Sequence, residues 1–151
     1  MPKRKNCVEY PTVSIIILNY NSKEFILKCI KSVLGSDYPK KNMEIILVDN
    51  ASIDGSVELV KNTFPNIRLL LNKKNLGFCE GNNVGIRSAN GEIVVILNQD
   101  TVVTNDWLVE IVRTIITNKN VGIVGSKLLN PDGTIQSVGY VCHKSLRIIP
   151  M

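Results

Sequence analysis

The sequence predicts an α/β fold built on a mostly parallel sheet with helices on both of its faces. Apolar runs of strand length alternate along the chain with segments whose apolar residues recur at helical spacing. This order is typical of parallel strands joined by helical crossovers. Two of the apolar runs also lead directly into polar residues that include Asp49 and Asp100. Ligand chemistry in open α/β sheets gathers where parallel strands end, so both aspartates are candidate functional residues.

The first predicted strand covers residues 13–18, VSIIIL, a run rich in β-branched residues that is typical of a strand buried on both faces. Asn21, with Glu24 three residues later, resembles a capping box and predicts the start of a helix. The apolar positions within residues 26–34 follow helical spacing, and Gly35 marks the predicted end of this helix.

The same alternation continues to the end of the chain. It predicts further strands over residues 44–48, 67–71, 93–97 and 121–124, a helix with the apolar positions Val57, Val60 and Phe64, a Gly/Asn-rich loop over residues 72–85 leading into a short helix, a helix with the apolar positions Trp107, Leu108, Ile111, Val112 and Ile115, and a hairpin that joins residues 128–129 to Ile135.

The length of 151 residues predicts a single domain, which we assign to residues 12–151. The basic residues that precede it, 1–11, are expected to form a lead-in. The hydrophobic content of 44% and charged content of 21% are typical of a globular protein. The apolar runs fall short of the roughly 20 residues that a membrane-spanning helix needs. No apolar signal-peptide core follows the basic N-terminus. We therefore expect a cytoplasmic protein.

The net charge of +5 suits anionic small molecules or peripheral binding at an anionic inner membrane face, with a solvated basic surface as the alternative. Basic and aromatic residues do not interleave as in RNA-binding surfaces, so we expect no nucleic-acid partner. A zinc site is not expected, because the chain has one histidine and no CxxC pair. Buried free thiols are expected instead for the cysteines, which are Cys7, Cys29, Cys79 and Cys142.

Asp100 is the candidate metal ligand. It follows residues 93–97, which we predict to be a buried strand. Mg²⁺ and Mn²⁺ favour carboxylate, phosphate and water oxygens, and one carboxylate is enough when substrate phosphates complete the coordination shell. The alternative is that Asp100 only caps the following turn.

Three other features each have a functional and a structural interpretation. Asp49 is a candidate for base or ribose recognition, or else forms an Asx turn. Tyr20 is a candidate to stack on a base, or else a partly buried loop aromatic. The glycine-rich residues 77–85 are candidates to bring backbone N–H groups to a phosphate at a helix N-terminus, or else form a loop that requires positive φ.

Five blocks, in this order, resemble family 2 glycosyltransferases: SIIILNYNS, EIILVDNASIDGS, NLGFCEGNNVGI, VVILNQDTVV and KLLNPDGTIQSVG. The resemblance spans residues 12–140 and is nearest to the rhamnosyltransferase-like branch. It implies the Rossmann-like GT-A fold, a UDP- or dTDP-sugar as the donor, a divalent Mg²⁺ or Mn²⁺ ion, and inversion at the sugar carbon. Its implied acceptor is a saccharide or a lipid-linked molecule, as in polysaccharide biosynthesis.

The resemblance also implies roles for individual residues. Tyr20 matches the aromatic residue that stacks on the base, and Asp49 matches the carboxylate that binds the pyrimidine. Asn19, Asn21 and Asn50 share the same predicted sheet edge and are expected to line the nucleotide site. The remaining matches are Gly77, Asn82 and Asn83 in the donor-binding loop, Asn98 in place of the first acid of the DxD motif, and Asp100 in its metal position.

Two departures from the family pattern bear on activity. Asn82 stands where many members have an arginine that contacts the diphosphate. The family's general base lies in a carboxylate motif farther downstream, so we expect it beyond Met151 and assign no catalytic residue here. The chain is therefore expected to be a truncated GT-A domain that lacks the acceptor and base portion.

Three functional hypotheses stay open at this point. The first is a glycosyltransferase, and the second is a truncated, non-catalytic nucleotide-sugar-binding or interaction module. The third is an unrelated Rossmann-like cofactor domain, which the lack of a glycine fingerprint after the first strand disfavours. A domain without its second half exposes apolar surface, so we also expect self-association and poor order after Gly139.

Overall fold

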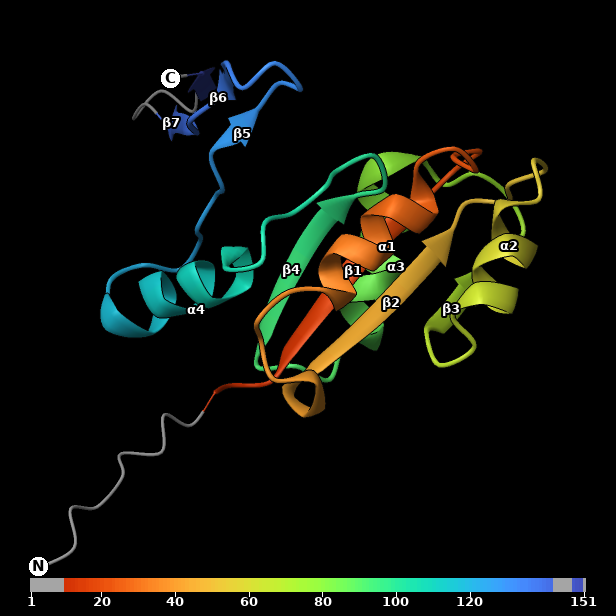
Figure 1. Ribbon diagram of the computed structural model, residues 1–151, viewed down its shortest axis with the longest axis horizontal. Helices are drawn as coiled ribbons and strands as arrows, with labels where there is room; N and C mark the ends of the chain where they lie inside the picture. The colour runs from red at the N-terminus through yellow and green to blue at the C-terminus, as the bar shows by residue number, and fades with distance from the viewer. Residues whose placement is uncertain (1–9, 143–147, 151) are drawn as a thin grey trace, which may run out of the picture. The chain divides into compact units, whose positions relative to one another are not determined.

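The computed structural model describes residues 10–142 and 148–150. Contacts between residues divide the chain into two compact units, Met1–Asp106 and Trp107–Met151 (Figure 1). Most of the basic lead-in predicted over residues 1–11 lies outside the described residues, as does part of the segment after Gly139. Within the described ranges, no helix has both the length and the apolar character needed to cross a membrane.

The first unit contains a parallel sheet with the strand order β3-β2-β1-β4 (Figure 1). The central strand β1 pairs in parallel with β2 on one side and with β4 on the other. Its residues are all buried, as the apolar run predicts. The mostly parallel α/β fold is therefore confirmed. The strands are β1 (Val13–Asn19), β2 (Met43–Asp49), β3 (Arg68–Leu71) and β4 (Ile93–Asn98).

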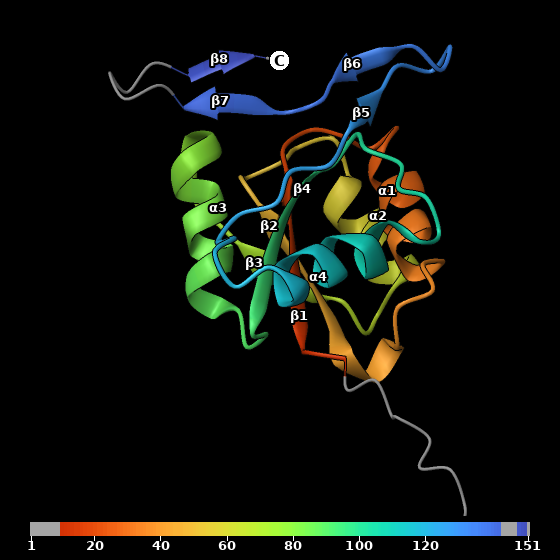
Figure 2. The same ribbon diagram turned by 90° about the vertical axis from the view of Figure 1, so that its left-hand side faces the viewer.

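Helices cover both faces of this sheet, as predicted. Figure 2 shows α1 (Ile26–Leu34) and α2 (Ser56–Thr63) on one face, and α3 (Gly77–Ser88) on the other. A short 3₁₀ helix, η1 (Lys40–Asn42), leads into β2. Each crossover returns the chain to the same end of the sheet, so the carboxyl ends of the four strands share one edge.

Helix α3 replaces most of the loop predicted over residues 72–85, so that prediction is wrong for the residues from Gly77 onward. The glycines that lowered the expected helix content serve packing instead. A Cβ added to Gly81 would lie 2.6 Å from Leu18, and one added to Gly85 would lie 3.0 Å from Val48. Only glycine lets the helix axis approach the sheet this closely. Helix propensity scales do not include such packing between a helix and a sheet.

Strand β4 corrects the prediction that residues 93–97 are buried throughout. In the described part of the chain it pairs only with β1, so it is an edge strand. The side chains of Val94 and Ile96 are 40% and 48% exposed, and among its apolar residues only Leu97 is buried. Within this unit α3 packs over β1 and β2, which leaves the α3-facing side of β4 open.

The start of α1 also differs from the expectation. The helix begins at Ile26 after Phe25, with no side-chain cap, so the predicted capping box of Asn21 and Glu24 is absent. Asn21 has a positive φ of 48°, and its side-chain oxygen instead accepts a hydrogen bond from the backbone N–H of Ile53. A tertiary contact between two loops has taken the role that the local pattern assigned to a helix cap.

The second unit contains one helix and two short antiparallel ladders. Helix α4 (Trp107–Thr117) carries the predicted apolar face, of which Leu108 and Val112 are buried. The predicted hairpin is confirmed, because β5 (Leu128–Leu129) pairs with β6 (Ile135–Ser137). A further pair joins β7 (Tyr140–Cys142) to β8 (Ile148–Pro150).

The strand predicted over residues 121–124 does not form in the structure. Its central residue, Ile123, is 93% exposed. An isolated apolar run needs a partner strand to satisfy its backbone groups, and no described strand of this unit pairs with it. Gly122 lowers the strand propensity of the run further, and Gly125 follows it directly.

Candidate functional site

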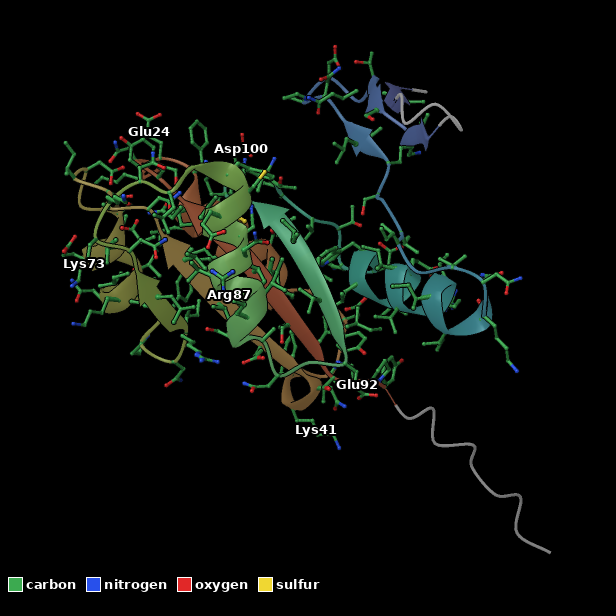
Figure 3. The ribbon with its side chains drawn as sticks, turned by 180° about the vertical axis from the view of Figure 1, so that it is seen from behind. Glu24, Lys41, Lys73, Arg87, Glu92 and Asp100 are labelled. Atoms are coloured by element: carbon green, nitrogen blue, oxygen red, sulfur yellow. The ribbon has the colours of Figure 1, made fainter. Side chains whose placement is uncertain are left out.

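A pocket of about 220 Å³ lies at the carboxyl edge of the first unit's sheet. The ends of β1, β2 and β4 and the first turn of α3 all contribute to its walls. Figure 3 shows Asp100 at this edge, at the opposite end of β4 from Glu92. The pocket is lined by Leu18, Tyr20, Asn50, Asn75, Gly77, Phe78 and Gln99.

Two aromatic side chains from different elements border this pocket. Tyr20 follows β1 and is 47% exposed, while Phe78 stands in the first turn of α3 and is 60% exposed. Exposed aromatic faces at a strand edge are suited to stacking on a planar ligand. The sequence analysis named Tyr20 but missed Phe78, because a phenylalanine in a segment predicted as a loop carries no signal of its own.

Asn19 and Asp49, at the ends of β1 and β2, form a buried polar network beside the pocket. The Asn19 amide donates to Asp49 Oδ1 at 2.8 Å and to Ser56 Oγ at 2.9 Å. Asp49 Oδ2 accepts from the backbone N–H of Ser52 at 2.9 Å, and Asp49 Oδ1 also accepts from Ser52 Oγ. Asp49 is therefore 3% exposed and engaged within the protein through both oxygens. The Asx-type contact that was its structural alternative is present.

Asn21 joins the loop after β1 to the loop after β2. Its backbone N–H donates to Ser52 Oγ at 2.9 Å, and its side chain accepts from Ile53. Ser52 thus contacts Asn21, Asn19 and Asp49 at once. These bonds hold the turn from which Tyr20 projects, so Asn19, Asn21 and Asp49 shape the edge, while Tyr20 faces the pocket.

Asn50 connects the end of β2 to the start of α3. Its side-chain Nδ2 donates to the carbonyl of Gly77 at 3.0 Å and to Asn75 Oδ1 at 3.1 Å. Its Oδ1 accepts from Asn72 Nδ2 at 2.9 Å. Gly77 has a φ of 75°, so the positive backbone angle that the sequence analysis gave as an alternative is present. Gly77 and Asn50 both line the pocket, whereas the sequence gave no reason to select Asn75.

Asn82 and Asn83 lie one turn farther along α3 and do not line the pocket. Asn82 is buried, and its Nδ2 donates to the carbonyl of Phe78 at 2.9 Å, while its Oδ1 has no partner among the described residues. Asn83 is exposed and donates to Glu80. The hydrogen bond from Arg87 holds the pKa of Glu80 below its usual value. This part of α3 therefore presents paired charges to solvent.

The end of β4 brings Asn98, Gln99 and Asp100 to the same edge. The carbonyl of Asn98 accepts from the backbone N–H of Thr101 at 3.2 Å and from Cys29 Sγ at 3.5 Å. Burial, with the nearby charge of Asp100 as the second cause, raises the pKa of Cys29 to about 12. Gln99 lines the pocket, and the side chains of Asn98 and Asp100 are exposed beside it.

The oxygen atoms at this edge fit a divalent ion that takes most of its coordinating oxygens from a bound phosphate ligand and water. Within the described ranges, no group of three His, Cys, Asp or Glu side chains gathers to hold a metal. Asp100 therefore offers one carboxylate, and an ion there would take its other ligands from phosphate and water. This donor set suits Mg²⁺ or Mn²⁺ and does not suit zinc.

A family model described as "Glycosyl transferase family 2" matches residues 14–139. The chain belongs to glycosyl transferase family 2. The match includes the ends of β1, β2 and β4 and the whole of α3. The family prediction is thereby confirmed, and so is the GT-A fold class, since the structural neighbours are GT-A glycosyltransferases.

Individual relatives agree with membership of glycosyl transferase family 2. Glycosyltransferase AglE of Haloferax volcanii is 34% identical over 121 residues, which are 78% of this chain and 40% of that protein. A Methanococcus voltae protein, named dolichyl N-acetyl-alpha-D-glucosaminyl phosphate 3-beta-D-2,3-diacetamido-2,3-dideoxy-beta-D-glucuronosyltransferase, is 32% identical over 68% of this chain and 33% of its own length. The chain thus spans two-fifths or less of these two relatives.

A solved structure of a mannosyltransferase also matches this chain. The mannosyltransferase PcManGT from Pyrobaculum calidifontis, in complex with GDP-Man and Mn²⁺, superposes with a TM-score of 0.66. The two are 28% identical, and the match covers 83% of this chain and 37% of that one.

Proposed function

We propose that the pocket binds the nucleotide of a UDP- or dTDP-sugar, and that the protein transfers the sugar with inversion to a saccharide or lipid-linked acceptor. The observation that carries this proposal is the common edge that brings Tyr20, Asn50 and Gln99 around one pocket, with Asp100 beside it. The NxD form of the Asn98–Asp100 segment is the reason to place the chain in the rhamnosyltransferase-like branch.

Tyr20 and Asp100 have distinct roles in this proposal. The exposed ring of Tyr20 stacks on the base, and such stacking contributes about 1–3 kcal/mol per base. Asp100 would hold a Mg²⁺ or Mn²⁺ ion together with the diphosphate, and Asn98 hydrogen-bonds a ribose or a metal-bound water. When bound, such an ion stabilises the departing diphosphate. The Mn²⁺ in the PcManGT structure supports the choice of metal.

Asp49 has an indirect role in the proposed site. Its two oxygens already accept bonds from Asn19 and Ser52, so it supports the turn beside Tyr20. A carboxylate has further acceptor capacity, and direct pyrimidine contact stays a prediction. Asn82 and Asn83 likewise stay predicted sugar-donor residues, although neither lines the pocket.

The acceptor side of the reaction is assigned to no side chain of the described residues. The name of the Methanococcus voltae relative includes dolichyl N-acetyl-alpha-D-glucosaminyl phosphate, which supports a lipid-linked acceptor. The proposal also includes one donor-binding domain over residues 12–151. It further includes peripheral association with an anionic membrane face, and self-association.

The test is the binding of UDP and dTDP by calorimetry, with and without Mn²⁺. We expect metal-dependent binding that Asp100→Ala abolishes. Asp37→Ala is the matched control, because Asp37 is an exposed aspartate in the connection from α1 to β2 and lies away from the pocket lining. Binding that is equally strong without the metal and in Asp100→Ala would refute the assignment of Asp100. No binding of either nucleotide would refute the sugar-donor site itself.

A further inference from the structure

We propose that Ser32 and Cys29 on α1 are positioning residues, which hold the loop that carries Asp100 in the orientation that a divalent ion requires. The inference rests on the proposed nucleotide and metal site. It adds two residues that lie outside the pocket lining and act through the backbone of the loop after β4.

The loop that carries Asp100 has no regular structure of its own. β4 ends at Asn98 and α4 begins at Trp107, and residues 99–106 between them form neither helix nor strand. Asp100 is exposed, and it would be the single protein carboxylate on an ion whose other ligands are phosphate and water. Its orientation therefore depends on the contacts that hold this loop from outside.

The first contact holds the turn in which Asp100 stands. The carbonyl of Asn98 accepts from the backbone N–H of Thr101 at 3.2 Å, which closes a four-residue turn with Asp100 in its third position. The same carbonyl accepts from Cys29 Sγ at 3.5 Å. Because Cys29 is 1% exposed within α1, the turn rests on a side chain that packing holds in place.

The second contact holds the chain as it leaves the turn. The backbone N–H of Val103 can only donate, and it donates to Ser32 Oγ at 3.1 Å. The hydroxyl of Ser32 donates in its turn to the carbonyl of Cys29 at 2.7 Å, inside α1. The hydroxyl hydrogen is thereby used within the helix, and a lone pair of the oxygen is left for the loop.

Together the two contacts define the direction of the loop, which runs beside α1 in Figure 2. Cys29 and Ser32 are three residues apart and stand on one face of the helix. The residues they hold, Asn98 and Val103, lie two positions before and three positions after Asp100. The loop is thus ordered when the protein folds and does not have to be ordered when an ion binds, which favours binding.

The experiment measures the Kd of UDP by calorimetry on the full chain, with and without Mn²⁺. The ratio of the two Kd values is the tightening that the metal provides. In Ser32→Ala we expect this ratio to fall about five-fold, the effect of one lost hydrogen bond, while the metal-free Kd stays unchanged. A residue that only stabilises the fold would change both Kd values together.

Ser36→Ala is the matched control for Ser32→Ala. The Ser36 hydroxyl donates to the carbonyl of Val33 at 2.7 Å, as that of Ser32 donates to Cys29, but no loop residue is bonded to it in the described part of the chain. The ratio should be unchanged in this variant. In the Asp100→Ala background, Ser32→Ala should not alter the Kd measured with Mn²⁺, because Ser32 acts only through Asp100.

Amide hydrogen exchange of the protein without ligand measures the hold on the loop directly. The amide of Val103 should exchange faster in Ser32→Ala and stay protected in Ser32→Thr, since threonine in a helix can keep the same hydroxyl bonds. For the first contact, Cys29→Ala should lower the Mn²⁺ effect, and Cys29→Ser, which keeps a donor for Asn98, should restore part of it. Thermal unfolding of each variant identifies any that fails to fold.

The outcomes separate this inference from the proposed function. A ratio or a Val103 exchange rate that Ser32→Ala leaves unchanged overturns the role of Ser32, as does an equal loss of affinity with and without Mn²⁺. A Ser32→Thr variant that protects Val103 but lacks the Mn²⁺ effect overturns it too, and an unchanged ratio in Cys29→Ala overturns the role of Cys29.

Two results in the unmodified protein bear on the underlying site. UDP binding that Mn²⁺ does not strengthen overturns the assignment of Asp100 and this inference with it, while the nucleotide site stands. Binding of neither UDP nor dTDP under any condition overturns the proposed function as well.

Discussion

The contact between α3 and the sheet makes Gly85→Ala the sharpest test of the fold around the site. A Cβ at this position would lie closer than 3.0 Å to Ile16 Cγ2 and 3.0 Å from Val48 Cγ2. Ile16 and Val48 are fully buried on the two adjacent strands β1 and β2. Both contacting methyl groups sit directly on a β-carbon, so neither can retreat without a change of χ1 or a shift of the helix.

The expected magnitude follows from two opposing effects. Overpacking a rigid core costs about 1–3 kcal/mol, and two simultaneous clashes place this site near the upper end. Replacing glycine by alanine inside a helix returns about 1 kcal/mol. We therefore expect a net loss of about 2 kcal/mol in the free energy of unfolding, which corresponds to a Tm lower by about 4–8 °C for a domain of this size.

Circular dichroism during thermal and urea unfolding measures this loss. Gly125→Ala is the matched control, because a Cβ there meets nothing within 4 Å, and its effect should stay within about 0.5 kcal/mol. Ile16→Leu removes the clashing Cγ2, so Gly85→Ala should be less destabilising in that background. An unchanged or raised Tm for Gly85→Ala would refute the close approach of α3 to the sheet.

Two further predictions concern Tyr20 and Cys29. Tyr20→Ala should raise the Kd for UDP by about five- to 150-fold, because it removes the stacking ring. Tyr20→Phe should keep most of the affinity, and so should the control Phe25→Ala, since Phe25 is an exposed aromatic residue outside the pocket lining. An unchanged Kd in Tyr20→Ala would exclude stacking. Because the folded-state pKa of Cys29 is raised from 9.0 to about 12, its thiol stays neutral in the folded protein, and its contribution to stability is full below pH 9 and lost as the pH rises toward 12. Mapping of iodoacetamide adducts at pH 9 should find exposed Cys79 modified and Cys29 protected until the protein is denatured, and equal rates for the two thiols in the folded protein would contradict the prediction.

The sequence alone determined the family and the order of the elements in the first unit. Strand periodicity and helical spacing are local properties, so β1, β2, β3 and α4 could be predicted to within a few residues. The polar residues that end β1, β2 and β4 could be assigned to one edge, because parallel strands joined by crossovers share it. Tyr20, Asn50 and Gly77 are residues that the sequence predicts for the site and that the structure places in the pocket lining.

Only the tertiary structure decided which side chains face the pocket and which are used elsewhere. The helix over residues 77–88 forms because Gly81 and Gly85 pack against β1 and β2, an effect that no local propensity contains. β4 is half exposed because it has a single partner strand in its unit, and residues 121–124 form no strand because no described strand of their unit pairs with them. Burial and strand pairing depend on residues far away in the chain, and local patterns cannot report them.

The same reason separates Asp49 from Asn75. Asp49 ends an apolar strand and was easily selected from the sequence, yet contacts from Asn19 and Ser52 engage both of its oxygens. Asn75 had no distinguishing pattern, and it acquires a direction only through Asn50 and the backbone of Gly77. Residue type and strand position come from the sequence. Which donors and acceptors of a polar side chain remain without a partner depends on the residues that the fold brings together.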